Sequence, residues 1–420
     1  MKEEYLHHVF KTKQLGNTFI STKGQQVKIL DFGKHNYNAG PDFLECKVKI
    51  DNKIWAGQIE FHVKSSDWLK HNHQNDSNYN NVILHFVYEF DMDIQSGKMI
   101  LPTVELKNII NQKHYGKYQN YINSKNWVAC QNDLKPVDEF IIYQQKEKAL
   151  LNRLERKSNL IIELINQLNG DRKKVLFIQL FKAFGTNVNK TAFEKLGVLF
   201  DWKIISKLNK ENFKIQAYLF GLAGFLSKNI DDDYFNQLKT EFNYQKKLFD
   251  LQTMNFNEWK FSAMRPANFP TVRLAQLSHL LCKNTSPVES LNFEHLKNNL
   301  TIQLDEYWEV HYDFGKIGKR KTPNLTPSFI DLLLINVYIP YVFSISRLAD
   351  DEQQKLTAFE WLEKIKPEKN SIIDKWKKLN IEIKSAFDSQ SLIEQKNEFC
   401  SKNQCLKCKI GNALLKTGVC

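Results

Sequence analysis

Three polar side chains in one short segment have a spacing that suits metal-dependent hydrolysis. Residues 57–64 alternate in the manner of a β-strand, in which successive side chains point to opposite faces. Glu60, His62 and Lys64 therefore form one row. An acid, an imidazole and an amine in a row can bind a divalent ion and hold a hydrolytic water. The same alternation is also typical of an antiparallel strand whose polar face is merely solvated.

A second carboxylate, Asp42, can reach this row through a β-hairpin. Residues 43–50 and 54–64 alternate as two strands, and the residues between them have turn chemistry. A three-residue turn pairs Asp42 with His62 and puts both side chains on one face. A turn of two residues at 52–53 instead pairs Asp42 with Val63. This second register matches the apolar faces of the two strands better. A bulge near Gly40-Pro41, just before the first strand, would reconcile the two demands.

Pro41-Asp42 followed by Glu60 resembles the PD-(D/E)xK nuclease superfamily, whose pattern is Pro-Asp at a strand start and Glu-x-Lys on the hairpin partner. The resemblance implies that Asp42 and Glu60 bind Mg²⁺ or Mn²⁺ and that a lysine positions the nucleophilic water. This chain has His62 at the expected lysine position, with Lys64 two residues further on. The departure implies either that His62 or Lys64 takes the lysine's role or that the site no longer cleaves.

Five of the 11 histidines lie between residues 35 and 85, which favours a site in this part of the chain. His35 lies in the loop before the Pro-Asp pair, and His85 lies in an apolar strand. We interpret both as candidate accessory residues, although an imidazole in an apolar strand is often a hydrogen-bonded core group. His71 and His73 form either a second metal site or a solvated pair in a polar loop.

Three cysteines near the C-terminal end, Cys400, Cys405 and Cys408, are spaced C-x4-C-x2-C. Cys-x2-Cys is a common ligand pair for Zn²⁺ or an iron–sulfur cluster. Cys420 or the distant Cys130 could supply a fourth ligand. The spacing leaves zinc, a [4Fe–4S] cluster and free thiols open. Some recombination and CRISPR-associated nucleases of the superfamily carry such an iron–sulfur staple, with one remote cysteine.

Basic residues outside the hairpin suggest a surface for nucleic acid. Lys319 and Arg320 lie in a compact basic loop, and Arg265 and Arg273 lie around a helix start. These side chains could contact backbone phosphates, or they could be solvated or cap a helix. The formal net charge of +12 permits a polyanionic partner. The basic residues are mostly lysine, however, and a lysine-rich composition can be a general habit of a genome.

The elements that must position these residues divide the chain in two. About the first 110 residues alternate as strands, and from Val137 onward the apolar spacing is helical. We predict an α+β protein with an N-terminal restriction-endonuclease-like mixed sheet with helices, residues 1–125. A larger all-helical domain, residues 126–420, follows it and ends in the cysteine cluster. Hydrophobic residues make up 42% and charged residues 25%, which excludes a disordered or collagen-like chain.

The most apolar run, Leu332–Ile345, is interrupted by Asn336 and Pro340 and is shorter than the roughly 20 residues that span a bilayer. The first five residues contain no apolar signal core. We therefore expect no membrane association, a cytoplasmic location, and cysteines that act as thiols or metal ligands.

The whole chain is also similar to DUF2851, a bacterial family catalogued only as a domain of unknown function. The motifs that carry this similarity are Asn38–Phe43, Ser65–Trp68, Asn81–His85, Arg265–Pro270 with Arg273–Leu277, and Cys405–Asn412. This resemblance implies no established activity, so the functional hypothesis depends on the hairpin.

The leading hypothesis is a divalent-metal-dependent nuclease that acts on DNA or RNA. The alternative is a catalytically inactive nuclease-fold protein that acts as a nucleic-acid-binding or scaffold protein. A third reading is a metal-dependent hydrolase of another substrate that uses His35, His62 and His85.

Overall fold

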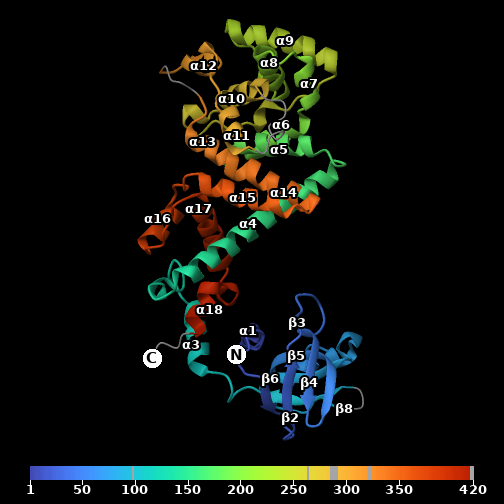
Figure 1. Cartoon of the computed structure of the whole chain (residues 1–420). Helices are drawn as coiled ribbons and strands as arrows, with labels where there is room; N and C mark the ends of the chain where they lie inside the picture. Colours follow the sequence, from blue (N-terminus) through green and yellow to red (C-terminus); the bar gives the residue numbers. More distant parts are fainter. Residues whose placement is uncertain (97–98, 263, 284–291, 320–323, 417–420) are drawn as a thin grey trace. The chain divides into compact units, whose positions relative to one another are not determined.

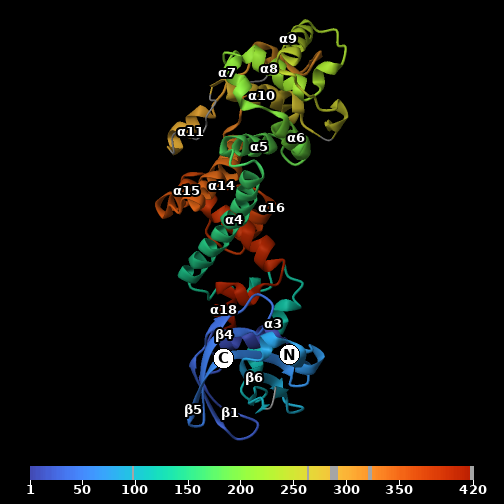
Figure 2. The same ribbon diagram turned by 90° about the vertical axis from the view of Figure 1, so that its right-hand side faces the viewer.

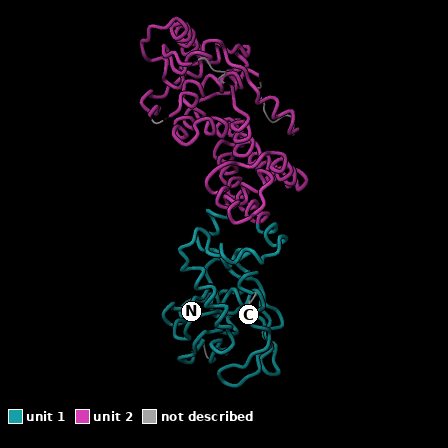
Figure 3. Tube along the Cα trace, turned by 90° about the vertical axis from the view of Figure 1, so that its left-hand side faces the viewer, with its two compact units in different colours: residues 1–145, 395–420 teal, residues 146–394 magenta. Residues whose placement is uncertain are grey.

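The computed structural model describes residues 1–96, 99–262, 264–283, 292–319 and 324–416. The chain forms two compact units (Figure 3). Unit 1 contains residues 1–145 and 395–420, and unit 2 contains residues 146–394. The predicted division at residue 125 differs from this one, because the C-terminal segment groups with the N-terminal part of the chain.

The described part of unit 1 contains a seven-stranded mixed sheet in the order β1-β2-β4-β5-β6-β9, with β3 paired to β4 (Figure 1). Neighbouring strands are antiparallel up to β5, whereas β5–β6 and β6–β9 are parallel. The predicted mixed sheet is therefore confirmed. The strands are β1 (Thr18–Ile20), β2 (Gln26–Asp31), β3 (Lys34–His35), β4 (Phe43–Ile50), β5 (Lys53–Lys64), β6 (Val82–Glu89) and β9 (Thr103–Glu105), and a separate hairpin joins β7 (Gln95–Ser96) to β8 (Met99–Ile100).

The register of hairpin β4–β5 differs from both registers expected from the sequence. Ile50 pairs with Lys53, so the turn consists of two residues that precede Lys53. The first of them, Asp51, has φ 50° and accepts a 2.9 Å hydrogen bond from the backbone N–H of Gln26. This contact to a neighbouring strand helps to position the turn. The contact is long-range, so it cannot be predicted from local turn preferences.

A bulge then shifts the hairpin by one residue. Glu45 has φ 59°, and the register changes between Phe43 and Cys46 so that Phe43 pairs with Ile59. The expected bulge therefore exists, but it lies within β4 rather than before it. The bulge puts Asp42 level with Glu60, whereas the two expected registers paired it with His62 or Val63.

The chain crosses from β5 to the parallel strand β6 through short helical turns. These are α2 (Asp67–Lys70), η1 (His73–Asn75) and η2 (Ser77–Tyr79). Parallel strands require such a crossover, because the chain must return to the same end of the sheet. The crossover carries His71 and His73 over the end of β5, and Trp68 is buried beneath it.

Helix α1 (Glu3–Lys11) packs on the sheet through Phe10, which is fully buried. The Phe10 ring contacts those of Phe43, Phe61 and Phe86, with centroid separations of 4.8, 5.1 and 5.4 Å. The aromatic cluster thus joins α1 to three neighbouring strands.

The remaining elements of unit 1 come from both ends of the chain. Helix α3 (Gln112–Ile122) and the C-terminal helix α18 (Lys409–Lys416) lie side by side (Figure 2). The Lys396 ammonium donates a 2.6 Å hydrogen bond to the Trp127 carbonyl. The other elements here are η3 (Gln131–Asp133), the π-helical segment η8 (Gln395–Cys400) and η9 (Cys405–Lys407).

The described part of unit 2 is helical, apart from the two-stranded hairpin of β10 (His311–Asp313) and β11 (Lys316–Ile317). The prediction of an all-helical domain is therefore wrong in this detail. Helix α4 (Glu139–Gln167) begins in unit 1 and continues into unit 2. The other helices are α5 (Arg172–Phe184), α6 (Lys190–Leu199), α7 (Trp202–Lys207), α8 (Asn212–Leu222), η4 (Phe225–Ser227), α9 (Asp233–Phe249), η5 (Phe256–Glu258), η6 (Pro266–Asn268), α10 (Pro270–Lys283), α11 (Phe293–Asn299), α12 (Glu306–Val310), α13 (Pro327–Leu333), η7 (Leu334–Tyr338), α14 (Ile339–Ala349), α15 (Glu352–Lys364), α16 (Ser371–Lys378) and α17 (Ala386–Glu394).

One described helical segment, Pro327–Ala349, is long and apolar enough to cross a membrane by length and composition. Within the 18-residue window that passes this test, 72% is buried inside the protein. Core helices of soluble proteins show the same burial. Residues 334–338 form a π-helical turn just before Pro340.

We predict that Phe10→Ala lowers the free energy of unfolding of unit 1 by about 3–5 kcal/mol, because it leaves a cavity among three aromatic rings. Hydrogen exchange of the β5 and β6 amides, read by mass spectrometry, measures the change. Phe140→Ala is the control, since Phe140 is 64% exposed and its removal costs less than about 0.5 kcal/mol. Equal exchange in the two variants would contradict the packing described.

Candidate active site

Two carboxylates, Asp42 and Glu60, lie next to each other on hairpin β4–β5. The Asp42 backbone N–H donates a 3.0 Å hydrogen bond to Glu60 Oε2, and the Phe61 backbone N–H donates one of 3.0 Å to Asp42 Oδ2. Each strand therefore holds the carboxylate of the other. The structure brings together the two acids that the sequence nominated, although in a different register.

The environment of this pair resembles that of a cation site. Glu60 is only 5% exposed, and Asp42 is half-buried beside it. Burial, followed by the repulsion from the Asp42 carboxylate, raises the pKa of Glu60 to about 9. A divalent cation would remove both costs, because it supplies the opposite charge to two crowded acids.

His62 is the next side chain of this row and is 1% exposed. Its Nε2 lies 3.8 Å from Glu60 Oε1 and 3.1 Å from His71 Nδ1, and its Nδ1 lies 2.8 Å from His85 Nε2. Burial, followed by the neighbouring imidazoles, lowers the pKa of His62 to about 2, and burial lowers that of His85 to about 3. Both rings are therefore neutral at pH 7, which is the form that binds metals.

The crossover after β5 adds two imidazoles to this group. The ligand atoms of His62, His71 and His73 all lie within 4.8 Å of one another, and no other set of three such side chains does so in the described chain. His73 Nε2 also lies 3.5 Å from Glu60 Oε1, and its ring stacks on Tyr79 at 3.8 Å. The loop histidines therefore join the hairpin site instead of forming a separate one.

Helix α1 contributes a residue that sequence reasoning missed. His7 Nε2 lies 3.1 Å from Asp42 Oδ2. Glu3 lies one helical turn before His7, and its pKa is raised by burial and, to a smaller degree, by Asp42. Glu3 and His7 are four residues apart, which puts them on one face of a helix. This spacing was the sequence signal that could have identified His7 as a site residue.

Two predicted residues have other surroundings. The Lys64 side chain is exposed, and in the described chain no hydrogen bond or ion pair joins its amine to Asp42 or Glu60. The strand ends at Lys64, whose backbone N–H donates to Asp67 Oδ2 at 2.8 Å. His35 contacts the rings of His7 and Phe43, with centroid separations of 5.5 and 4.9 Å, at the α1 side of the site.

The group thus combines two carboxylates with three imidazoles. Carboxylates suit Mg²⁺ and Mn²⁺, whereas imidazoles suit Zn²⁺, Fe²⁺ and other transition metals. His62, His71 and His73 could hold one divalent ion. Glu60 Oε1 lies 3.8 Å from His62 Nε2 and 3.5 Å from His73 Nε2, so this carboxylate could join them, with Asp42 beside it. His62 also has the outer partner His85 on its second ring nitrogen, as metal-binding imidazoles usually do.

Comparison with known proteins gives a family for this chain. The profile of a family described as "Protein of unknown function (DUF2851)" matches residues 3–371, which is most of the sequence. The chain belongs to the DUF2851 family. No curated protein and no solved structure matches it. The DUF2851 match includes every residue of the site described above, but these comparisons do not support the resemblance to PD-(D/E)xK nucleases.

The structure also gathers the cysteines of this DUF2851 protein. Cys130 comes from the turn before η3, and Cys400, Cys405 and Cys408 come from the C-terminal segment. Burial and then the other thiols raise the pKa of Cys130, and similar effects raise that of Cys400 to about 12 and that of Cys405 to about 11. Cys420, the other candidate ligand, lies outside the described residues.

A buried amide supports this cluster from one side. Gln395 Nε2 lies 3.3 Å from Cys400 Sγ and 3.5 Å from Cys408 Sγ. Gln395 Oε1 accepts a 2.6 Å hydrogen bond from Gln145. No three of these thiols have sulfur atoms within 4.8 Å of one another.

The predicted nucleic-acid-binding residues lie in unit 2. Arg273 and Lys319 line one cavity, where Arg273 is 8% exposed and Lys319 is exposed. Arg265 is exposed just before η6. Arg320 lies outside the described residues.

We predict that the hairpin site binds Mn²⁺ and that Glu60→Gln and His73→Ala each weaken binding by at least about tenfold. Electron paramagnetic resonance of free Mn²⁺ in a titration of chelator-treated protein measures the affinity. Mn²⁺ is the suitable probe because thiolates prefer softer ions. His114→Ala on α3 of the same unit is the control. Equal affinity in His73→Ala and His114→Ala would exclude the site.

Proposed function

We propose that this DUF2851 protein is a divalent-metal-dependent nuclease that hydrolyses phosphodiester bonds of DNA or RNA in unit 1. The observation that carries the proposal is the pairing of Asp42 with Glu60 beside three imidazoles. Paired carboxylates bind the metal ions that activate water and stabilise a phosphoryl transition state.

Asp42 and Glu60 would hold the ion, and His73, whose Nε2 lies 3.5 Å from Glu60 Oε1, lies where it would add a nitrogen ligand. Mn²⁺ fits this mixed set better than Mg²⁺, which prefers oxygen ligands in a strict octahedron. When bound, the ion would supply charge stabilisation and a water of lowered pKa.

His62 is the group at the position of the superfamily's lysine, and it would orient or deprotonate the attacking water. A neutral imidazole accepts a proton at one ring nitrogen while the other donates. If His62 Nε2 accepts, Nδ1–H donates to His85 Nε2 across 2.8 Å. The exposed His71, 3.1 Å from His62 Nε2, offers a route for a proton between this buried ring and solvent.

The choice of a phosphodiester substrate rests on two further points. Pro41-Asp42 and Glu60 match the nuclease pattern, and the formal net charge of +12 favours a polyanionic partner. Together they favour DNA or RNA over an uncharged substrate.

The alternative is a catalytically inactive nuclease-fold protein that binds nucleic acid or acts as a scaffold. The exposed position of Lys64 favours it, because no lysine then lies at the carboxylates. The low pKa of His62 also makes this imidazole a weak base. Salt-dependent binding of nucleic acid without any cleavage would support this alternative.

We predict that the purified protein cleaves DNA or RNA in the presence of Mn²⁺ and that Asp42→Asn and Glu60→Gln each reduce the rate at least about a hundredfold. Gel analysis of labelled single- and double-stranded substrates measures the rate. Glu139→Gln, an exposed acid on α4 of the same unit, is the matched control and keeps full activity. Cleavage that persists in both site variants would refute the assignment. Hydrolysis of small phosphoesters alone would point to a hydrolase of another substrate.

We also propose that Cys130, Cys400, Cys405 and Cys408 hold a [4Fe–4S] cluster. These thiols are buried near one another in unit 1 and come from segments far apart in the sequence, which supports a shared cluster. A bound cluster would join these segments within unit 1, as a metal does in small domains.

We predict that anaerobically purified protein is brown and contains about four iron ions per chain with matching sulfide. Cys130→Ser and Cys405→Ser each lower the iron content and the visible absorbance. Cys282→Ser on α10 is the control and leaves both unchanged. Elemental analysis that finds zinc, or no metal, would exclude the cluster.

A further inference from the structure

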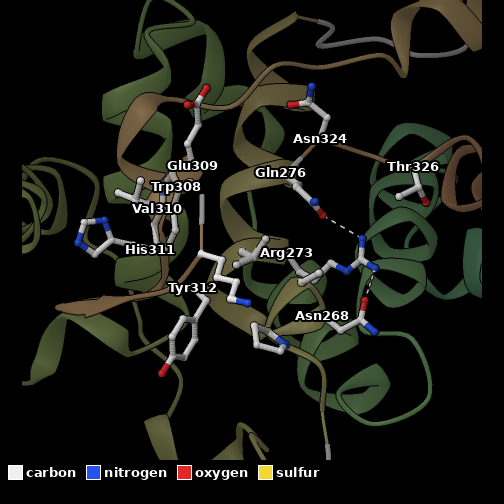
Figure 4. Close-up of a pocket in the computed structure, with 15 residues that line it drawn as sticks. Asn268, Arg273, Gln276, Trp308, Glu309, Val310, His311, Tyr312, Asn324 and Thr326 are labelled. Carbon is white, nitrogen blue, oxygen red and sulfur yellow. Dashed lines mark hydrogen bonds between the residues drawn. The ribbon is translucent and has the colours of Figure 1, made fainter. Parts of the chain in front are cut away.

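Unit 2 contains a cavity of about 380 Å³ that the proposed nuclease chemistry does not use. Its walls come from η6, the first turns of α10, residues 308–312, and the segment that leads to α13 (Figure 4). Sites for small molecules usually have volumes of roughly 300–1,000 Å³. The cavity therefore has the size of a small-molecule site.

One wall of the cavity carries a buried cation. Arg273 is 8% exposed, and Figure 4 shows its guanidinium between two amide side chains. Nη1 donates to Gln276 Oε1 at 2.9 Å, and Nη2 donates to Asn268 Oδ1 at 2.7 Å. The Arg273 Cζ atom lies 3.8 Å from the centre of the Phe329 ring. These contacts fix the direction of the guanidinium.

This guanidinium lacks a countercharge in the described part of the chain. Both of its hydrogen-bond acceptors are neutral, and its buried Nε has no partner. Burial lowers the pKa of Arg273 to about 10, so the group is still charged at pH 7. Proteins normally pair a buried charge with an opposite one, since an unpaired charge in the interior is costly.

The surroundings of Arg273 favour an anion at this place. Arg273 lies in the first turn of α10, where the helix dipole disfavours a cation and favours an anion. Lys319 lines the cavity as a second cation, and Glu309 is the acid among the lining residues. His311 also lines it, and its Nδ1 lies 2.8 Å from the Tyr307 carbonyl.

The remaining lining suits the organic part of a ligand. Pro266, Val272, Val310 and Tyr312 give apolar and aromatic surface. Asn268 uses its carbonyl oxygen on Arg273, so its amide N–H groups are directed elsewhere and can donate to an oxyanion. Two cations and an amide donor match the several oxygens of a phosphate group.

We propose that this cavity binds a small organic phosphate of the size and chemistry of a nucleoside monophosphate. The phosphate accepts hydrogen bonds from Arg273, Lys319 and Asn268, and the ring system lies against Tyr312 and Pro266. The site is independent of the carboxylates of unit 1 and goes beyond the proposed nuclease activity.

Isothermal titration calorimetry of the full chain with adenosine monophosphate tests this proposal. EDTA is present so that metal ions in unit 1 cannot bind the phosphate. We expect binding at least about tenfold tighter than that of adenosine, because the phosphate supplies the missing countercharge. The double variant Asp42→Asn/Glu60→Gln should bind adenosine monophosphate as the wild type does. The binding experiment therefore tests the cavity of unit 2 independently of the nuclease proposal for unit 1.

Single substitutions in the cavity test which side chains bind the phosphate. Arg273→Met keeps the apolar stem on Phe329 and should weaken binding by about 10- to 100-fold. Lys319→Gln should weaken it by about two- to fivefold. Lys377→Gln on α16, which removes an exposed charge from the same unit, is the matched control and should bind normally.

Three results would overturn the proposal. The first is adenosine binding as tightly as adenosine monophosphate. The second is benzoate binding as tightly as adenosine monophosphate, which would exclude a phosphate-specific site. The third is unchanged affinity in the variants. If circular dichroism shows that Arg273→Met does not fold, Lys319→Gln and Asn268→Ala decide the matter, because unchanged affinity in both overturns the assignment.

Discussion

The candidate site of unit 1 depends on a reciprocal pair of hydrogen bonds across hairpin β4–β5. A backbone N–H of each strand binds the carboxylate of the other strand, at Asp42 and Glu60. These bonds are possible only because the bulge at Glu45 shifts the register by one residue. Without this shift the two acids would lie on opposite faces of the sheet, since side chains alternate. One residue in the left-handed region therefore decides whether a two-acid site exists.

The two units bury charge in opposite ways. In unit 1, burial and mutual repulsion protonate Glu60 and keep His62 and His85 neutral, so the interior holds little charge until a cation enters. In unit 2, the guanidinium of Arg273 stays charged and is supported by neutral amides. The ordinary pKa values of carboxyl and imidazole groups, about 4 and 6.5, are close enough to 7 that burial can neutralise these groups. The ordinary pKa of a guanidinium is above about 12, so Arg273 stays charged.

Local sequence patterns predicted the longer strands of the sheet and nominated the two acids, because period-two alternation and turn residues are local signals. The short strands β1 and β3 were missed, and His35 lies in β3 rather than in the predicted loop. The register could not be predicted, since it depends on a long-range bond from Gln26 to Asp51 and on the backbone of Glu45. Helix α1 was missed, and with it His7, although its spacing from Glu3 carries a helical signal. Strand alternation predicted that Lys64 lies on the same face as Glu60 and His62. The strand ends at Lys64, however, and its side chain is exposed.

Unit 1 is interrupted in sequence by the whole of unit 2, and this has a consequence for biosynthesis. Residues 395–408 supply three of the four clustered thiols, whereas Cys130 is translated about 270 residues earlier. At about 5–20 residues per second, Cys130 waits roughly 10–60 seconds before its partners leave the ribosome. A chain truncated within unit 2 thus contains the strands of the sheet but lacks three of the four thiols. The thiol cluster of unit 1 can therefore form only after residues 395–408 have been translated.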